Sequence, residues 1–238
     1  MQSERFEFKK FGVNHGLSSM KVGIDSILLG CWTDVKTAKK ILDVGTGCGI
    51  LALMCAQRNP DAIIEGIDLD APSIKEAEEN FKASPWGDRI SAILSDFLDC
   101  KKNGYDLIIS NPPFFNSGVN KIVNSRERAR HQDTLSPKIL IEKGRRMLTS
   151  TGIISMIVPY QQKEELIQFA LSRGLKDRRC AMVKGRRELS PKRILLEFEN
   201  SEWEEGNECL EEEIILESSL GNPSEEFKFL CKDFYLNF

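Results

Sequence analysis

The sequence predicts an α/β fold, a doubly wound and mostly parallel sheet with helices on both faces. The first reason is that short β-rich runs alternate with helix-favouring stretches, as they do in repeated βα units. The second is that 238 residues suit one such domain, and no long linker, repeat or low-complexity tract divides them. We therefore expect residues 1–238 to form a single domain.

Local residue types predict each element in chain order. Apolar, β-branched runs predict strands, and the stretches between them predict helices. Pro72 occurs where the first turn of a helix tolerates proline, Gly174 ends a helix, and a polar turn with Pro191 joins the last two strands. The expected strands are 40–44, 62–67, 89–94, 105–109, 152–158, 175–184 and 193–199, and the expected helices are 27–32, 50–58, 72–83, 135–148 and 161–172.

Composition and charge exclude some classes of protein. The chain has 33 Lys and Arg against 36 Asp and Glu, a formal net charge of −3. Its apolar runs fall far short of the ~20 residues that a membrane helix needs, and its first residues lack the hydrophobic segment of a signal peptide. A cytoplasmic protein is therefore expected. Taken alone, the slight acidity disfavours a nucleic-acid partner, because such partners are usually held by excess Lys and Arg.

The cysteine and histidine content argues against a metal centre. Seven cysteines are present, and no two have the C-x-x-C spacing that a zinc site favours. The two histidines, His15 and His131, are too few for a His-rich centre. We therefore expect reduced thiols and no metal. No feature indicates an obligate protein partner, so a monomer is expected.

A glycine loop after the first expected strand is the first chemical signal. It reads Asp43-Val-Gly-Thr-Gly-Cys-Gly49, and a helix follows. Glycines permit a tight turn and close approach of a ligand. The spacing is G-x-G-x-G, not the G-x-G-x-x-G of a dinucleotide site, where the extra residue helps to place a pyrophosphate. Asp43, Gly45, Gly47 and Gly49 therefore suit a ligand with a charged amino-acid end and no pyrophosphate.

Acidic residues follow the next two strands. Asp68 ends the second strand, where a carboxylate can accept hydrogen bonds from both ribose hydroxyls, and Asp70 is the near alternative. Asp96 follows the third strand and can accept a hydrogen bond from an adenine amino group. Beside the glycine loop, these acids indicate S-adenosylmethionine as the cofactor and S-adenosylhomocysteine as the product.

The fourth strand runs directly into Asn111-Pro-Pro-Phe114. Pro112 and Pro113 fix φ and remove two backbone donors, so the turn holds its carbonyl oxygens rigidly at the end of the strand. The Asn111 oxygen and such a carbonyl can both accept from one exocyclic NH₂ group, and Phe114 offers a face for stacking a planar group. With the two hydrogens held, the amine lone pair is aimed at a methyl donor, and no general base is required.

These two motifs resemble the class I, Rossmann-like S-adenosylmethionine-dependent methyltransferases that modify amino groups. The resemblance covers residues from about 20 to 160. It implies a seven-stranded sheet whose last strand is antiparallel. Further segments are similar to bacterial tRNA1(Val) adenine-N6 methyltransferases, which act at adenine 37 beside the anticodon. Those segments are Phe8–His15, Met20–Asp25, Ile27–Gly30 and Asp233–Leu236.

The resemblance also assigns roles to residues. It implies that a segment of about residues 1–35 caps the cofactor through Lys21, Gly23 and Asp25. It implies that Asn111, itself also a cofactor contact, holds the target amine together with Pro112. The family usually has Thr where this chain has Ile24.

Two basic regions indicate RNA as the substrate. Residues 115–133 contain few apolar anchors and follow the expected active site directly. Residues 173–193, the basic tract, hold nine basic and two acidic residues. Residues 197–217, the acidic segment, hold ten Glu and no Lys or Arg, so the mild net charge averages a basic body with one acidic segment. The expected RNA-contacting residues are Lys121, Arg126, Arg128, Arg130, Lys184, Arg186, Arg187 and Arg193.

Three hypotheses for function remain open. The first is a tRNA adenine-N6 methyltransferase that splays the target base onto Phe114 and holds phosphates with Arg and Lys. The second is a methyltransferase acting on another amine, either the side-chain amide of a protein glutamine or an amine of rRNA. The third is a cofactor-binding protein without catalysis, which the intact Asn111–Phe114 turn disfavours.

Overall fold

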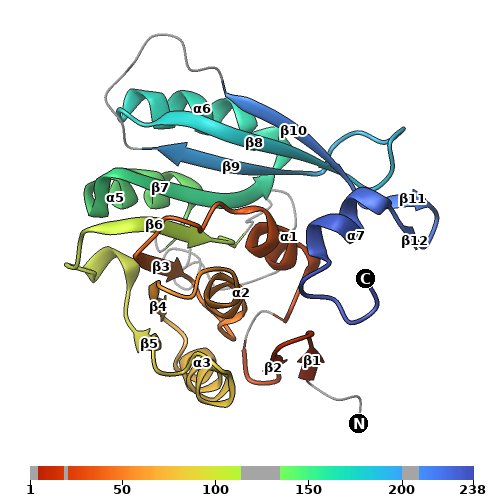
Figure 1. Ribbon diagram of the computed structural model, residues 1–238. Coiled ribbons are helices and arrows are strands. Elements are labelled where there is room, and N and C mark those ends of the chain that lie inside the picture. The colour runs from red at the N-terminus through yellow and green to blue at the C-terminus, as the bar shows by residue number, and fades with distance from the viewer. Residues whose placement is uncertain (1–4, 19–20, 114–134, 200–208) are drawn as a thin grey trace, which may run out of the picture.

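The computed structural model describes residues 5–18, 21–113, 135–199 and 209–238. Its central sheet has eight strands in the order β10-β8-β9-β7-β6-β3-β4-β5 (Figure 1). In that order the strands are Leu210–Ile215, Lys176–Lys184, Arg193–Glu199, Leu148–Pro159, Tyr105–Ser110, Lys40–Val44, Ile63–Asp68 and Ile90–Leu94.

The seven expected strands are all present, and the doubly wound, mostly parallel α/β fold is confirmed. Strands β5, β4, β3, β6 and β7 pair in parallel, and β9, the last of the expected seven, runs antiparallel to both β7 and β8. The expected number of seven needs one correction, because β10 adds an eighth strand parallel to β8. Three consecutive glutamates in Leu210–Ile215 concealed it, since they read as part of an acidic segment.

Helices cover both faces of the sheet and bury one apolar core on each. The helices α1 (Ile24–Trp32), α2 (Ile50–Arg58), α3 (Ala71–Ala83) and α7 (Glu225–Cys231) contribute to the first core, and α5 (Pro137–Met147) and α6 (Lys163–Ser172) to the second. Strand side chains alternate between the cores, so Leu107 faces the first and Ile108 the second. None of the helices in the described ranges has the length and apolar character needed to cross a membrane.

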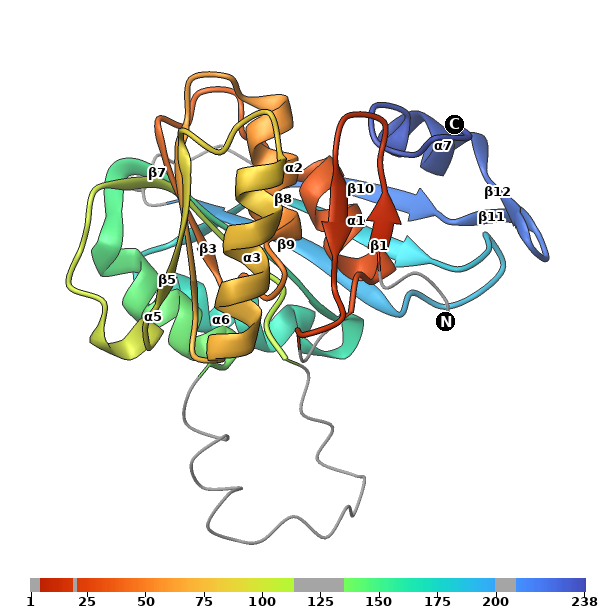
Figure 2. The same ribbon diagram turned by 90° about the horizontal axis from the view of Figure 1, so that it is seen from below.

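The N-terminal hairpin and the C-terminal segment pack together near α1 (Figure 2). An N-terminal hairpin of β1 (Arg5–Glu7) and β2 (Gly12–Asn14) lies against the C-terminal segment. Phe8 stacks on Phe11 with 4.7 Å between ring centroids, and Lys9 Nζ donates to the carbonyls of Lys232 and Phe238. The remaining short elements are η1 (Phe97–Asp99), η2 (Tyr160–Gln162), β11 (Glu217–Ser219) and β12 (Asn222–Pro223).

Candidate functional site

The glycine loop turns tightly at the carboxyl end of β3. Gly45, Gly47 and Gly49 have φ values of 72°, 54° and 85°, a left-handed conformation that favours glycine. Gly49 is the N-cap of α2, and a Cβ there would lie 2.3 Å from Phe81. The predicted loop therefore requires glycine for conformation and for space, and it leads into a helix N-terminus.

Asp43 is fully buried beneath this loop. Its Oδ2 accepts from the Thr46 hydroxyl at 2.6 Å and from the Ala52 amide at 3.2 Å. Its Oδ1 is buried and has no hydrogen-bond partner among the described residues. Burial raises the pKa of Asp43 to about 7. An unsatisfied buried carboxylate oxygen costs free energy that a cationic ligand group can offset, so this feature fits the ammonium end of an amino-acid ligand.

The two acids that compete for the ribose role differ in their contacts. Asp68 accepts from the Gly47 amide at 2.9 Å through Oδ2 and from the Asp70 amide at 3.0 Å through Oδ1. Asp70 is the N-cap of α3 and accepts from both the amide and the hydroxyl of Ser73. The Asp70 carboxylate is thus occupied in capping α3, whereas the Asp68 carboxylate contacts the glycine loop. Asp96 caps η1 by accepting from the Leu98 amide at 2.8 Å.

A polar face of α3 fixes part of the N-terminal segment beside the glycine loop. Glu76 is buried and accepts from the amides of Leu17 and Ser18 at 2.9 and 2.8 Å. Asn80 is also buried and donates to the carbonyls of Asn14 and Cys48, each at 2.8 Å. Sequence reasoning missed both residues. Their spacing with Ser73 places all three on one helical face, which was the available signal.

Asn111 lies at the same sheet edge as the glycine loop, because β6 is the parallel neighbour of β3. The Ser110 hydroxyl donates to the Val44 carbonyl at 2.7 Å and ties the two strand ends together. Asn111 Nδ2 donates to Ser26 Oγ at 2.9 Å, while Oδ1 is buried and has no partner among the described residues. Pro112 is buried and Pro113 is partly exposed. Phe114 lies outside the described residues.

The three N-terminal residues expected over the cofactor differ in their surroundings. Lys21 and Gly23 are exposed, and Gly23 is the N-cap of α1. Asp25, in the first turn of that helix, accepts from Arg193 Nε at 2.8 Å. An expected cofactor contact and an expected RNA contact are therefore joined by an ion pair.

The expected RNA-contacting residues of the basic tract are all paired with carboxylates. Besides Arg193, these pairs are Lys184 with Glu213, Arg186 with Glu188, and Arg187 with Glu226. The acidic segment supplies further partners, since the wholly buried Glu197 accepts from Arg178 at 3.1 Å. The two oppositely charged stretches thus neutralise each other within the sheet. Lys121, Arg126, Arg128 and Arg130 lie outside the described residues.

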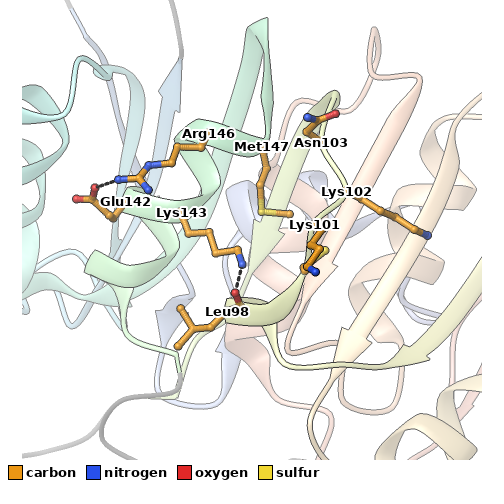
Figure 3. Close-up of a pocket in the computed structure, with 9 residues that line it drawn as sticks. Leu98, Lys101, Lys102, Asn103, Glu142, Lys143, Arg146 and Met147 are labelled. Carbon is orange, nitrogen blue, oxygen red and sulfur yellow. Dashed lines mark hydrogen bonds and ion pairs between the residues drawn. The ribbon is translucent and has the colours of Figure 1, made fainter.

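Sequence reasoning also missed a cationic hollow of about 440 Å³ between the segment leading into β6 and the second half of α5 (Figure 3). Lys143 Nζ donates to the Leu98 carbonyl across it, and Arg146 pairs with Glu142 at 2.9 Å. The basic residues that line it come from two separate segments, and neither segment alone forms a noticeable basic cluster in the sequence. The lining residues are Leu98, Cys100, Lys101, Lys102, Asn103, Glu142, Lys143, Arg146 and Met147.

Solved structures share this fold. A predicted O-methyltransferase from Agrobacterium tumefaciens superposes with a TM-score of 0.62 over 88% of this chain and 96% of its own, at 18% identity. A protein from Listeria monocytogenes, described as a class I S-adenosylmethionine-dependent methyltransferase, gives a TM-score of 0.60 over 87% of this chain and 67% of its own, also at 18% identity. The fold is therefore that of the class I methyltransferases.

Sequence relatives define the family more narrowly. Residues 16–182 match the Methyltransferase small domain family. A protein of Tolumonas auensis named tRNA1(Val) (adenine(37)-N6)-methyltransferase is 40% identical over 99% of this chain and 98% of its own length. A protein of the same name from Parabacteroides distasonis is 39% identical over 99% of each. The chain belongs to the family of tRNA1(Val) (adenine(37)-N6)-methyltransferases.

Proposed function

We propose that this protein transfers a methyl group from S-adenosylmethionine to the N6 amine of adenine 37 in tRNA1(Val). The observation that carries this proposal is the Oδ1 atom of Asn111, which is buried and has no partner among the described residues at the sheet edge that holds the glycine loop. A buried acceptor without a donor suits an incoming amine. The names of the relatives favour a tRNA substrate over a protein glutamine or an rRNA amine.

The residues around the glycine loop fit the cofactor. S-adenosylmethionine supplies an electrophilic methyl group on its sulfonium. Asp43 would face the ammonium end, Asp68 the ribose hydroxyls and Asp96 the adenine amine, while Gly45, Gly47 and Gly49 permit close approach. In support, Asp43 Oδ1 is an unsatisfied buried acceptor, and Asp68 already contacts the loop. Lys21, Gly23 and Asp25 would close over the cofactor from the N-terminal segment.

The chain's part in the reaction is to hold the amine. Asn111 Oδ1 and the Pro112 carbonyl accept the two hydrogens of the N6 amine, so its lone pair is directed at the methyl group. Pro113 keeps the turn rigid, and Phe114 stacks on the base. An aryl amine is a weak nucleophile, and positioning with preorganised acceptors lowers the barrier without a general base.

RNA binding would use both basic regions. Lys121, Arg126, Arg128 and Arg130 follow the Asn-Pro-Pro-Phe turn, and Lys184, Arg186, Arg187 and Arg193 belong to the basic tract. Contacts to phosphates would position the tRNA, and the amine-holding turn would select the base. We propose that the protein acts as a monomer. A tRNA substrate implies a cytoplasmic location.

Nucleoside mass spectrometry of tRNA from cells lacking this protein tests the proposal. We expect N6-methyladenosine to disappear from one tRNA and to return when the wild-type gene is restored. An unchanged tRNA profile would contradict the proposal and redirect attention to a protein or rRNA amine.

A further inference from the structure

We infer that Ser26 is a positioning residue that holds the amide of Asn111 with its oxygen toward the substrate amine. This inference rests on the proposed function, because it assumes that Asn111 accepts from the N6 amine. Its basis is the hydrogen bond from Asn111 Nδ2 to Ser26 Oγ at 2.9 Å. The two residues are 85 positions apart in sequence, and the bond joins the first turn of α1 to the end of β6.

In this arrangement the nitrogen of the Asn111 amide contacts the protein, and its oxygen is left for the substrate. Its Nδ2–H group donates to Ser26 Oγ, and its oxygen is buried with no partner among the described residues. If the amide were turned by 180°, its N–H groups would point at the hydrogens of the amine, and donor would face donor. The Ser26 hydroxyl, which can bond to either end of the amide, sets the amide plane before the substrate arrives, and the N–H groups of the amine then favour the orientation with the oxygen toward them.

Ser26 can hold this position because α1 is anchored in the core. Leu28 and Leu29 in the same helix are fully buried. Beside Ser26, Asp25 binds Arg193 at the start of β9. The helix therefore cannot shift the Ser26 hydroxyl without disturbing packing on its buried side. The N-terminal segment thereby contributes one hydroxyl to the proposed amine-holding turn.

Binding measurements with two matched RNAs test this role. The probes are an anticodon stem-loop with adenine at the target position and the same RNA with purine, which lacks the amine, both with S-adenosylhomocysteine present. Wild-type protein should bind the adenine RNA more tightly. Ser26→Ala should reduce that preference by about three- to tenfold, the usual weight of one hydrogen bond. Its kcat should fall by a similar factor with the KM for cofactor unchanged, and Ser26→Thr, which keeps a hydroxyl, should restore both.

A double-mutant cycle separates positioning from a structural effect. If Ser26 acts through Asn111, Ser26→Ala should change nothing further in an Asn111→Ala background. An undiminished adenine preference in Ser26→Ala, or an equal loss in both backgrounds, would overturn the inference. Failure of the proposed function is distinguishable, because wild-type protein itself would then show no adenine preference. That result would also remove the ground for assigning Ser26 a role.

Discussion

The glycine loop and the basic tract show two ways in which a charged or polar stretch can be used. In the glycine loop, short-range bonds such as Thr46 to Asp43 shape the backbone and leave one buried acceptor unsatisfied. In the basic tract, the cations find their partners mainly in distant segments, and the charge is largely neutralised within the protein. The first region therefore leaves one buried acceptor that a donor group of a ligand can satisfy. The second is held together by its charges, so any RNA bound there would have to replace existing ion pairs at the surface.

The largest effect should come from Asn111→Ala, which tests whether Asn111, at the carboxyl edge of the sheet, takes part in methyl transfer. Removing a preorganised acceptor for the amine should slow methyl transfer by about 10³-fold or more, or about 4 kcal/mol in the barrier. Cofactor affinity should hardly change, because the glycine loop and its acids are untouched. Single-turnover kinetics and calorimetric titration with S-adenosylmethionine measure the two effects. Equal losses in both would mean that Asn111 is structural.

The sequence was most informative where the geometry is local. The glycine loop and the Asn-Pro-Pro turn each lie within a few residues of a strand end, so residue type and spacing sufficed to predict their place. Ser26 and Glu76 could not be found in the same way, because their partners, Asn111 and residues 17–18, lie 85 and about 60 positions away. Which surfaces meet depends on packing of the whole sheet.

Charge pairing was unpredictable for the same reason. Arg179 lies directly opposite Glu197, and Lys176 directly opposite Glu199, in the pairing of β8 with β9. That register is a property of the folded sheet, whereas a count along the chain sees one basic and one acidic stretch. The eighth strand, β10, was not predicted for the same reason. Its glutamates, such as Glu213, pair with basic residues of the neighbouring strand, which the linear sequence does not show.

Glu197→Ala should give the next largest effect and tests the structural use of charge. Glu197 is wholly buried and shared by Arg178 and Arg179, which keep other carboxylate partners when it is removed. We expect the free energy of unfolding to fall by about 2 kcal/mol, because the hydrogen bonds that Arg178 and the Asp34 amide donate to this buried carboxylate are lost. Glu213→Ala, at the more exposed pair with Lys184, should cost at most about 1 kcal/mol. Urea denaturation measures both, and similar losses would contradict the distinction.

The buried Asp43 carboxyl beneath the glycine loop should make the free energy of unfolding depend on pH. Asp43 has a pKa raised from 3.8 to about 7 by burial, so between these values the folded state binds a proton that the unfolded state has released. Stability from this group is therefore full below about pH 4 and is lost as the pH rises through 7, with a slope of at most about 1.4 kcal/mol per pH unit.

Thermal unfolding of the cofactor-free protein between pH 5 and 8 measures this effect. Asp43→Asn can still accept from Thr46 and Ala52 but cannot ionise, so its stability should decline less over the same range. A decline as steep as in the wild type would assign the pH dependence to another group.

The smallest expected effect is a change in the salt dependence of tRNA binding. It tests whether cations of the basic tract contact RNA phosphates. Arg186 and Arg187 pair with Glu188 and Glu226 at the surface, where such pairs contribute little and phosphates can replace the carboxylates. Changing both to Glu should weaken tRNA binding and reduce the slope of log K against log salt by about 1–2. Lys82→Glu on α3, also an exposed partner of a glutamate, is the matched control and should leave the slope unchanged. If the double variant keeps the wild-type slope, the tract serves the fold alone, and the cationic hollow beside α5 becomes the next surface to reverse in charge.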